Sequence, residues 1–314
     1  MKYINSMREG MRIRDVYLCK SRQIQLTKNG KEYASVVLQD RSGTADGKIW
    51  DLGNPGISDF EAQDYVAVEA DVTVYNGSIQ LNIKRIRRAD EGEYVPADYL
   101  PVSERDLDEM YAEILAIADT VKNRYLKALL DAFFREDKDF IGRFRFSSAA
   151  KTVHHGFVGG LMEHTIGVAR AAEFMHSRYP YLNYDLLITA SLCHDIGKVR
   201  EINPFPDNDY SDDGQLLGHI VIGVEMLDEK LRNIPDFPAK LASELKHCIV
   251  AHHGEFEFGS PKKPAIAEAL ALNLADNADA KLELMKELLK AAGDNNGWLG
   301  FNKFVDSNIR KTRS

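Results

Sequence analysis

The chain has 314 residues, of which 44% are hydrophobic, so it is long and apolar enough for two domains that each bury a core. Its net charge of −8 argues against a general nucleic-acid coat protein, and its three scattered cysteines argue against a disulfide framework or a thiolate metal site. No apolar run reaches the roughly 20 residues of a membrane span and the first residues lack the apolar core of a signal peptide, so we expect a cytoplasmic protein.

Residues 12–88 contain short apolar runs separated by turn residues. Between residues 65 and 75 every second side chain is apolar, which is typical of a strand with one buried face, and the following Asn76-Gly77 pair predicts a hairpin. Five strands in fewer than 90 residues resemble an OB-fold, a small all-β barrel. We therefore predict an N-terminal OB-fold barrel over residues 1–90.

This predicted barrel has a charge balance that differs from the rest of the chain. It carries 14 Lys and Arg against 12 Asp and Glu, whereas the other residues carry 26 against 36. Aromatic rings and basic side chains are the groups that hold single-stranded nucleic acid on such barrels. The candidate nucleic-acid-binding residues are Tyr33, Lys48, Trp50, Arg85, Arg87 and Arg88. Two alternatives stay open: Trp50 plugs one end of the barrel, or the basic run is a solvated strand end.

Beyond the barrel the pattern changes from strands to helices. Residues 91–102 contain two prolines, a glycine and several acids, and they are predicted to form a linker. Residues 103–296 repeat apolar side chains at helical spacing, starting from a predicted N-cap at Ser103, and form an all-α domain. Residues 297–314 are expected to close the chain as an amphipathic tail docked through its aromatic rings, Trp298, Phe301 and Phe304.

Histidines and aspartates occur on helix faces that should be apolar. His164 and His194 each share a face with apolar residues three, four or seven positions away, so both point inward. A single buried histidine is more often a core residue than a ligand, but buried carboxylates beside it, Asp195 and Asp276, need a cation or a partner. With His219, His252 and His253 they supply imidazole and carboxylate ligands, which suit Mn, Fe, Co, Ni or Zn in a catalytic site.

The order His164, His194-Asp195, Asp276 resembles the HD superfamily of metal-dependent phosphohydrolases, and the further histidines resemble its two-metal members. With an OB-like segment ahead, the stretches "HHGFVGGLMEHT" (154–165), "GQLLGHIVIG" (214–223) and "HHGEFEFGSPKKP" (252–264) resemble the YhaM family of bacterial exoribonucleases along nearly the whole chain. That resemblance implies removal of nucleotides from the 3′ end of RNA, and sometimes of single-stranded DNA, supported by manganese or cobalt.

The resemblance also implies roles for individual residues. Asp195 would bridge two cations, with His164, His194 and Asp276 on the first, and with His219 and one or both of His252 and His253 on the second. Lys198 would hold a phosphate oxygen or pair with Glu201, and His155 and Lys151 would grip the scissile or terminal phosphate. Glu163 and Asp279 would orient metal ligands, although a solvated helix face explains Glu163 as well.

The sequence leaves two other functions open. An HD hydrolase of the same chemistry acts on free nucleotides or cyclic dinucleotides, with the barrel used for assembly. Alternatively, the metal is structural and the chain is a non-catalytic nucleic-acid binder. Substrate length separates the first alternative from an exonuclease, and tight binding of uncut oligonucleotides in Mn²⁺ would favour the second. A homo-oligomer is plausible for a chain with this much amphipathic helix.

Overall fold

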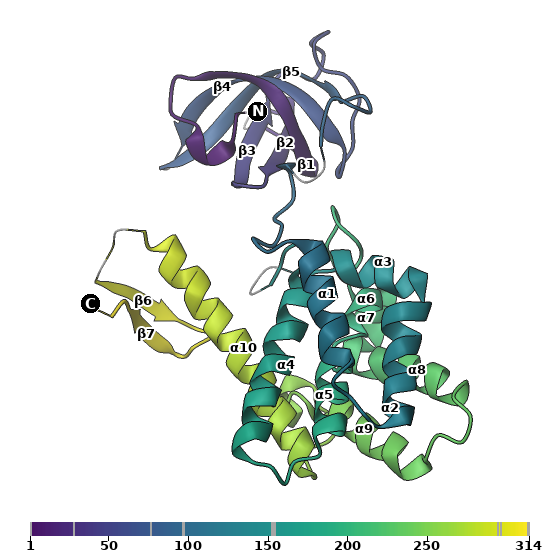
Figure 1. Ribbon diagram of the computed structural model, residues 1–314. Coiled ribbons are helices and arrows are strands. Elements are labelled where there is room, and N and C mark those ends of the chain that lie inside the picture. Colours follow the sequence, from purple (N-terminus) through teal and green to yellow (C-terminus); the bar gives the residue numbers. More distant parts are fainter. Residues whose placement is uncertain are drawn as a thin grey trace. The chain divides into compact units, whose positions relative to one another are not determined.

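The computed structural model describes residues 2–27, 29–75, 77–95, 98–151, 155–293, 295 and 297–312. The chain divides into two compact units, residues 1–102 with 205–207, and residues 103–204 with 208–314 (Figure 1). The first is built from strands and the second mainly from helices, as the sequence patterns predict. No helix within the described ranges combines the length and the apolar character needed to cross a lipid bilayer.

The first unit is a closed five-stranded barrel with strand order β1-β2-β3-β5-β4, in which β4 pairs back with β1. Only the β3–β5 pair is parallel, and this connectivity is that of the predicted OB-fold. A short helix, η1, precedes the strands. The element bounds are η1 Ile4–Ser6, β1 Arg12–Leu26, β2 Glu32–Asp40, β3 Gly43–Ile49, β4 Tyr65–Tyr75 and β5 Ser78–Arg88.

Alternation of side chains fills the barrel. Residues 66, 68, 70 and 72 of β4 are buried while their neighbours face outward, because successive side chains of a strand point to opposite faces. They pack with Val36, Leu38 and Leu81 in the core of the barrel. The alternation ends before Val74, which is exposed, and Asn76 of the predicted hairpin lies outside the described residues.

Residues 91–102 differ from the predicted free linker, since they belong to the first unit. Tyr94 stacks on Tyr65 with ring centroids 3.8 Å apart, and Tyr99 meets the same ring edge-on at 5.1 Å. Gln39 Nε2 donates to the carbonyl of Tyr99, and the amide of Arg41 donates to the carbonyl of Asp98. Aromatic packing and these bonds hold the segment on the barrel, although its prolines and acids are typical of linkers.

The second unit is built from helices around one apolar core (Figure 1). Helix α4 packs against α5, α10 and α1, and α9 contacts α5, α8 and α10, so segments far apart in the sequence surround the same core. The element bounds are α1 Leu107–Ala118, α2 Arg124–Asp131, η3 Ala132–Glu136, α3 Lys138–Phe146, α4 Gly160–Arg178, α5 Tyr184–Cys193, α6 Lys198–Glu201, α7 Asp212–Leu216, α8 Gly218–Arg232, α9 Ala239–Ala251, η4 Phe256–Phe258 and α10 Ala267–Ala291.

The start of the helical unit differs from the predicted N-cap. Asp106, not Ser103, caps α1, because its carboxylate accepts from the amides of Asp108 and Glu109. Ser103 Oγ instead donates to Glu163 Oε2 of α4 at 2.6 Å. That bond gives Glu163 a partner across the unit.

The predicted amphipathic tail is a two-stranded antiparallel sheet, β6 Trp298–Asn302 and β7 Ser307–Arg310. Its rings are not docked: Trp298, Phe301 and Phe304 are all exposed, while Ile309 is buried. The expectation of a docked tail is therefore wrong. The two strands expose most of their side chains, and the three aromatic rings are among the exposed ones.

Candidate metal centre

Five helices bring the predicted ligands to one place in the helical unit. His164 lies in the first turns of α4, Asp276 lies in α10, and His219 opens α8. His194 and Asp195 follow the C-terminus of α5, a helix whose residues 186–193 are all buried, so both side chains start from inside the core. His252 and His253 follow the end of α9 in the same way. Four of these polar residues therefore lie at the ends of apolar helices inside the core, and not in the middle of an apolar helix face.

A first group consists of His164, His194 and Asp276, whose ligand atoms all lie within 4.8 Å of one another. His164 Nε2 is 3.2 Å from Asp276 Oδ1 and 3.2 Å from His194 Nε2. All three side chains are mostly buried, and His194 is completely so. Two imidazoles and a carboxylate at this spacing are suited to a divalent transition-metal ion.

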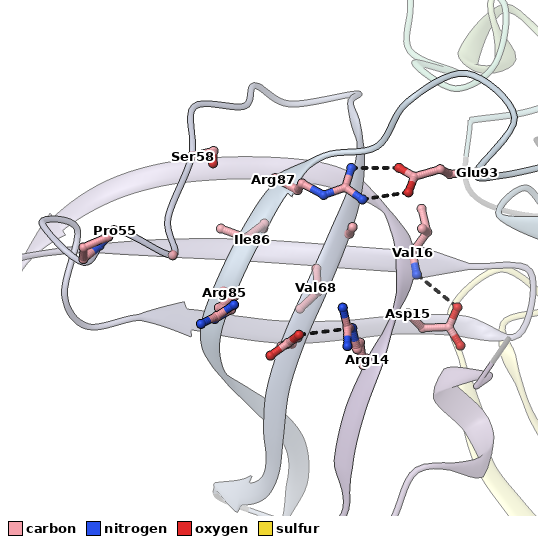
Figure 2. A pocket seen from close by; sticks show the side chains of 13 residues that line it. Arg14, Asp15, Val16, Pro55, Ser58, Val68, Arg85, Ile86, Arg87 and Glu93 are labelled. Carbon is pink, nitrogen blue, oxygen red and sulfur yellow. Dashed lines mark hydrogen bonds and ion pairs between the residues drawn. The ribbon is translucent and has the colours of Figure 1, made fainter.

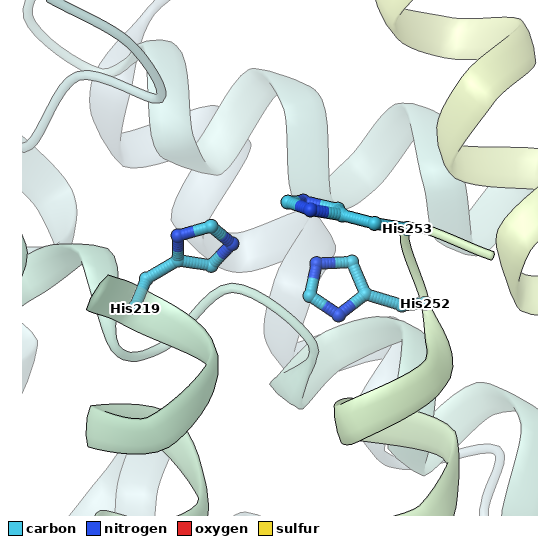
Figure 3. Close-up of side chains that lie close together, drawn as sticks. All are labelled: His219, His252 and His253. Carbon is cyan, nitrogen blue, oxygen red and sulfur yellow. The ribbon is translucent and has the colours of Figure 1, made fainter. Parts of the chain in front are cut away.

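A second group consists of His219, His252 and His253, and Figure 3 shows their three rings turned toward one another. The ring centroids of His252 and His253 are 4.3 Å apart, and the ring of His219 is 5.0 Å from that of His253. The sequence left open whether one or both of His252 and His253 face the site. The structure brings both into the group.

Asp195 lies between the two groups. Its Oδ2 is 3.5 Å from His164 Nε2 and 3.4 Å from His194 Nε2. Its Oδ1 faces the other way, 3.4 Å from His219 Nε2 and 3.6 Å from His252 Nε2. One carboxylate therefore presents one oxygen to each group, which is the arrangement of a bridging ligand between two cations.

The histidines share one orientation, in which Nδ1 is bonded and Nε2 faces inward. A ring whose Nδ1 is held by an acceptor presents the other nitrogen to a metal in a defined tautomer. The Nδ1 acceptors are Asp279 Oδ2 for His164 at 2.7 Å, Ser191 O for His194 at 2.8 Å, Glu201 Oε1 for His219 at 2.9 Å, Ile249 O for His252 at 2.6 Å and Phe258 O for His253 at 2.7 Å.

Several buried polar atoms of the centre have no hydrogen-bond partner among the described residues. They are Asp195 Oδ1, His219 Nε2 and His252 Nε2, which face one another at 3.4 to 3.6 Å without hydrogen-bond geometry. Burial lowers the pKa of His252, so this imidazole is neutral and keeps its lone pair. Buried polar atoms without partners are costly in a folded protein, and a cation among them would satisfy all three, so the residues fit a metal ion.

The carboxylates of the centre are held in their charged form. Burial alone would raise the pKa of Asp195, but the charges of Lys198 and His194 keep it well below its usual range. Burial likewise opposes ionisation of Asp279, yet hydrogen bonds from His155 and His164 lower its pKa to about 2. Negative charge is therefore available to cations throughout the neutral pH range.

The three predicted phosphate contacts have different surroundings, and two of them, Lys198 and His155, contact carboxylates of the centre. Lys198 Nζ pairs with Asp195 Oδ2 at 2.6 Å, so its partner is Asp195 and not the Glu201 of the alternative interpretation. His155 is buried, and its Nε2 is 3.1 Å from Asp279 Oδ2. Lys151 is half-exposed and pairs with Asp209 at 2.6 Å. His154, the neighbour of His155, lies outside the described residues.

Two glycines permit close approaches that bulkier residues would block. A Cβ on Gly197 would lie 2.0 Å from the carbonyl of His219, so glycine lets the start of α8 reach the turn that carries Asp195. A Cβ on Gly167 would lie 1.9 Å from Asp279 Oδ1, so glycine in α4 lets Asp279 reach His164. Neither role is visible in the sequence, because both contacts join segments distant in the chain.

Sequence reasoning missed one functional residue of the centre, Glu201 as an orienting group. Its Oε1 accepts from both the amide and Nδ1 of His219, at 2.9 Å each. The sequence analysis considered it only as a partner for Lys198. The signal was a glutamate buried in a short helix directly after the Gly197-Lys198 pair, since a buried carboxylate needs a donor.

On the barrel, two of the predicted nucleic-acid contacts form an exposed aromatic pair. Tyr33 and Trp50 stack with ring centroids 4.8 Å apart, and Trp50 is 46% exposed, so it does not plug the barrel. Lys48 Nζ lies 5.7 Å from the Tyr33 ring centroid and donates to Ser35 Oγ. Tyr33 in β2, Lys48 in β3 and Trp50 directly after β3 thus place two stacked rings beside an amine.

The predicted basic run lies elsewhere on the barrel. β3 pairs with β5 only through residues 80–82, so Arg85, Arg87 and Arg88 lie past that pairing, where β5 runs beside β4. Figure 2 shows Arg85 and Arg87 lining one pocket with Arg14. Arg87 makes two 2.7 Å bonds to Glu93, and Arg88 pairs with Asp64 at 2.5 Å. Arg87 and Arg88 are exposed at the strand end, as in the alternative left open by the sequence, and each already has a carboxylate partner.

Comparison with known proteins gives relatives that span both units. The family model described as HD domain matches residues 161–281. The chain is 34% identical over 282 residues to the 3′-5′ exoribonuclease YhaM of Bacillus velezensis, covering 90% of this chain and 88% of that protein. It is 35% identical to the protein of the same name from Listeria innocua, covering 87% and 86%.

Among solved structures, the second OB-fold domain of replication protein A from Methanococcus maripaludis covers 29% of this chain and 98% of its own, at 15% identity and a TM-score of 0.21. The YhaM relatives share a third of the residues along nearly the full length of both chains. The HD match, residues 161–281, includes Asp195 and every residue of both ligand groups. The chain therefore belongs to the YhaM family of 3′-5′ exoribonucleases.

Proposed function

We propose that this protein removes nucleotides from the 3′ end of single-stranded RNA by hydrolysing phosphodiester bonds at a centre that holds two divalent cations. The relatives named as 3′-5′ exoribonucleases supply the class of reaction. The observation that carries the proposal is Asp195, which turns one oxygen to each of two groups of imidazoles. Such a pair of sites suits the hydrolysis of phosphodiesters.

His164, His194 and Asp276 would hold the first cation, His219, His252 and His253 the second, and Asp195 both. When bound, the cations lower the pKa of the attacking water and offset the negative charge that builds on the phosphate. We propose Mn²⁺ as the native ion, as the resemblance to the YhaM family implies; Co, Fe, Ni and Zn are the alternatives, because imidazole and carboxylate ligands without thiolate accept them as well.

Lys198 and His155 act on the phosphate in this proposal. The ammonium of Lys198 is held against Asp195 with a small part of its side chain exposed, so it places a positive charge where phosphate oxygens would lie. His155 shares Asp279 with His164, and its Nδ1 has no hydrogen-bond partner among the described residues. In its doubly protonated form His155 would donate from this nitrogen to a phosphate oxygen, while its Nε2 donates to the carboxylate that orients His164.

The barrel holds the RNA strand in the proposed function. Tyr33 and Trp50 would stack on bases, with Lys48 beside them on a phosphate. Lys151, Arg85, Arg87 and Arg88 are proposed as weaker contacts. Arg87, Arg88 and Lys151 would have to exchange existing carboxylate partners for phosphates, and Arg85 lies apart from the aromatic pair. Binding of single-stranded DNA, a homo-oligomeric state and a cytoplasmic location stay predictions.

The direct experiment uses metal-stripped protein, restored separately with Mn²⁺, Co²⁺, Mg²⁺ or Zn²⁺, and a 5′-labelled single-stranded RNA 20-mer. A ladder of products that shortens from the 3′ end, absent in Asp195→Asn, is the expected result. An uncut 20-mer in every metal would instead point to free nucleotides, tested next by phosphate release. Tight binding without cleavage would point to a nucleic-acid-binding protein with a structural metal.

A further inference from the structure

The metal centre is not equally buried on all sides. His194 and His252 are completely buried and His164 is nearly so, whereas His219, His253 and Asp276 are partly exposed. The second ligand group thus has two residues that a substrate phosphate can approach, His219 and His253. The side chains that flank these two histidines decide what surrounds the phosphate.

The segment directly after His253 presents two aromatic rings to solvent. Phe256 is 62% exposed and Phe258 is 64% exposed, both within η4, a single turn that a nearby left-handed Gly259 ends. Exposed phenylalanines are unfavourable in water, and two in three residues form a local apolar surface. η4 is tied to the centre, because the carbonyl of Phe258 accepts from His253 Nδ1 at 2.7 Å.

The residues near His219 expose apolar side chains as well. Leu217, directly before the Gly218-His219 pair, is 44% exposed, and Val221 is exposed in the next turn of α8. The rings of His219 and His253 are 5.0 Å apart, so the segments that carry Leu217 and Val221 and η4 each hold one of two neighbouring imidazoles. A ligand that fits this surface carries a phosphate for the cations and a flat aromatic group beside that phosphate.

We propose that Phe256 and Phe258 form a stacking platform for the bases at the 3′ end of the RNA, next to the scissile phosphate. A nucleotide is the ligand in which a flat apolar ring lies one sugar away from a phosphate, and base–aromatic stacking accepts every base. Lys263 Nζ lies 5.6 Å from the Phe256 ring centroid and pairs with Glu255, so the platform carries a cation at its edge. The inference rests on the proposed exonuclease activity and adds to it a base contact inside the catalytic unit.

The test compares the protein with the double variant Phe256→Ala, Phe258→Ala, using the full chain in Mn²⁺. The matched control is Phe174→Ala, which removes a similarly exposed ring from α4, ten residues beyond His164. Substrates are a single-stranded RNA 20-mer and the same 20-mer with abasic sugars at its last two positions. Loss of stacking should raise KM for the intact RNA by about 5- to 100-fold in the double variant, with a smaller change in kcat and none in the control.

The abasic RNA tests whether the rings contact the bases. If the two phenylalanines were only structural, removing the bases would affect the wild type and the double variant equally. Removing the bases should weaken the wild-type reaction by a similar factor but should change the double variant little, because the two partners of one contact are not additive. Equal abasic penalties in both proteins, or an unchanged KM, would overturn the inference. If the sedimentation coefficient changes in the double variant but not in the control, the rings contact a second copy of the chain. That result would also overturn the inference.

Two further outcomes are kept separate. If the wild-type protein cuts no RNA in any metal, the proposed function fails, and the platform fails with it. If the double variant binds less Mn²⁺, the support of His253 has been disturbed, and Phe256→Ala alone repeats the comparison. The carbonyl of Phe256 accepts from Gly259, so this substitution leaves the bond between Phe258 and His253 in place.

Discussion

A single carboxylate joins the two groups of ligands, so Asp195 is the residue on which the proposed chemistry depends most. Replacing it by Asn keeps its size but removes the charge that faces His164 on one side and His219 on the other. We expect Asp195→Asn to lower RNA hydrolysis by at least about three orders of magnitude and to leave the circular dichroism spectrum unchanged. Wild-type turnover by a fully metallated variant would contradict the assignment.

Asp279 acts on the metal centre indirectly, because its carboxylate accepts a hydrogen bond from Nδ1 of the proposed ligand His164. Asp279→Asn preserves the close fit against Gly167 while removing the charge that holds Nδ1–H of His164 in place. Loss of such a partner weakens metal binding by about 10- to 100-fold. Calorimetric titration of metal-stripped protein with Mn²⁺ should show this loss in one of two binding events. Equal affinities in the variant and the wild type would mean that Asp279 does not orient a ligand.

At the scale of elements, the centre depends on how closely α8 approaches the turn between α5 and α6. Gly197→Ala would place a methyl group 2.0 Å from the carbonyl of His219, a backbone atom that cannot rotate away. We expect destabilisation of about 1–3 kcal/mol, and separation of His219 from Asp195 should remove one of two bound Mn²⁺ ions. Urea denaturation and metal analysis of the purified variant measure both effects.

Gly142→Ala is the matched control for this prediction. Gly142 lies in α3, and a Cβ there would meet no other atom within 4 Å. The substitution should stabilise the protein by up to about 1 kcal/mol, because alanine favours the helix, and should leave the metal content unchanged. Equal effects at both glycines would show that the contact between Gly197 and α8 is not needed.

Elements also show which features of the fold the sequence pattern predicts. Alternation in β4 and helical spacing in α4 or α10 predicted these elements correctly, because each depends on which face of one segment is buried. The short helices α6 and α7 and the β6–β7 hairpin were not predicted. Four or five residues carry too little periodicity, and the hairpin rings are exposed where a docked amphipathic tail was expected.

At the scale of the whole molecule, the barrel is proposed to act only on substrates long enough to reach it. The double variant Tyr33→Ala, Trp50→Ala removes the exposed aromatic pair and should raise KM for a 20-mer by about 5- to 100-fold, while dinucleotide hydrolysis stays unchanged. Charge reversal of Arg87 and Arg88 should have a smaller effect, since both already pair with carboxylates. KM is measured for each variant with the 20-mer and with the dinucleotide. An equal rise in KM for both substrates would mean that the barrel is structural.

The sequence by itself determined the order of the two folds and predicted which residues are the candidate metal ligands. Strand and helix periods are local, and the order His164, His194-Asp195, Asp276 is written in the chain. Only the tertiary structure decided how those residues meet: that Asp195 turns one oxygen to each group, that Glu201 and Asp279 hold imidazoles, and that Lys198 pairs with Asp195. Apart from Lys198 and Asp195, which are three positions apart, these contacts join different helices, up to 115 residues apart for His164 and Asp279, so they depend on helix packing that no local pattern contains.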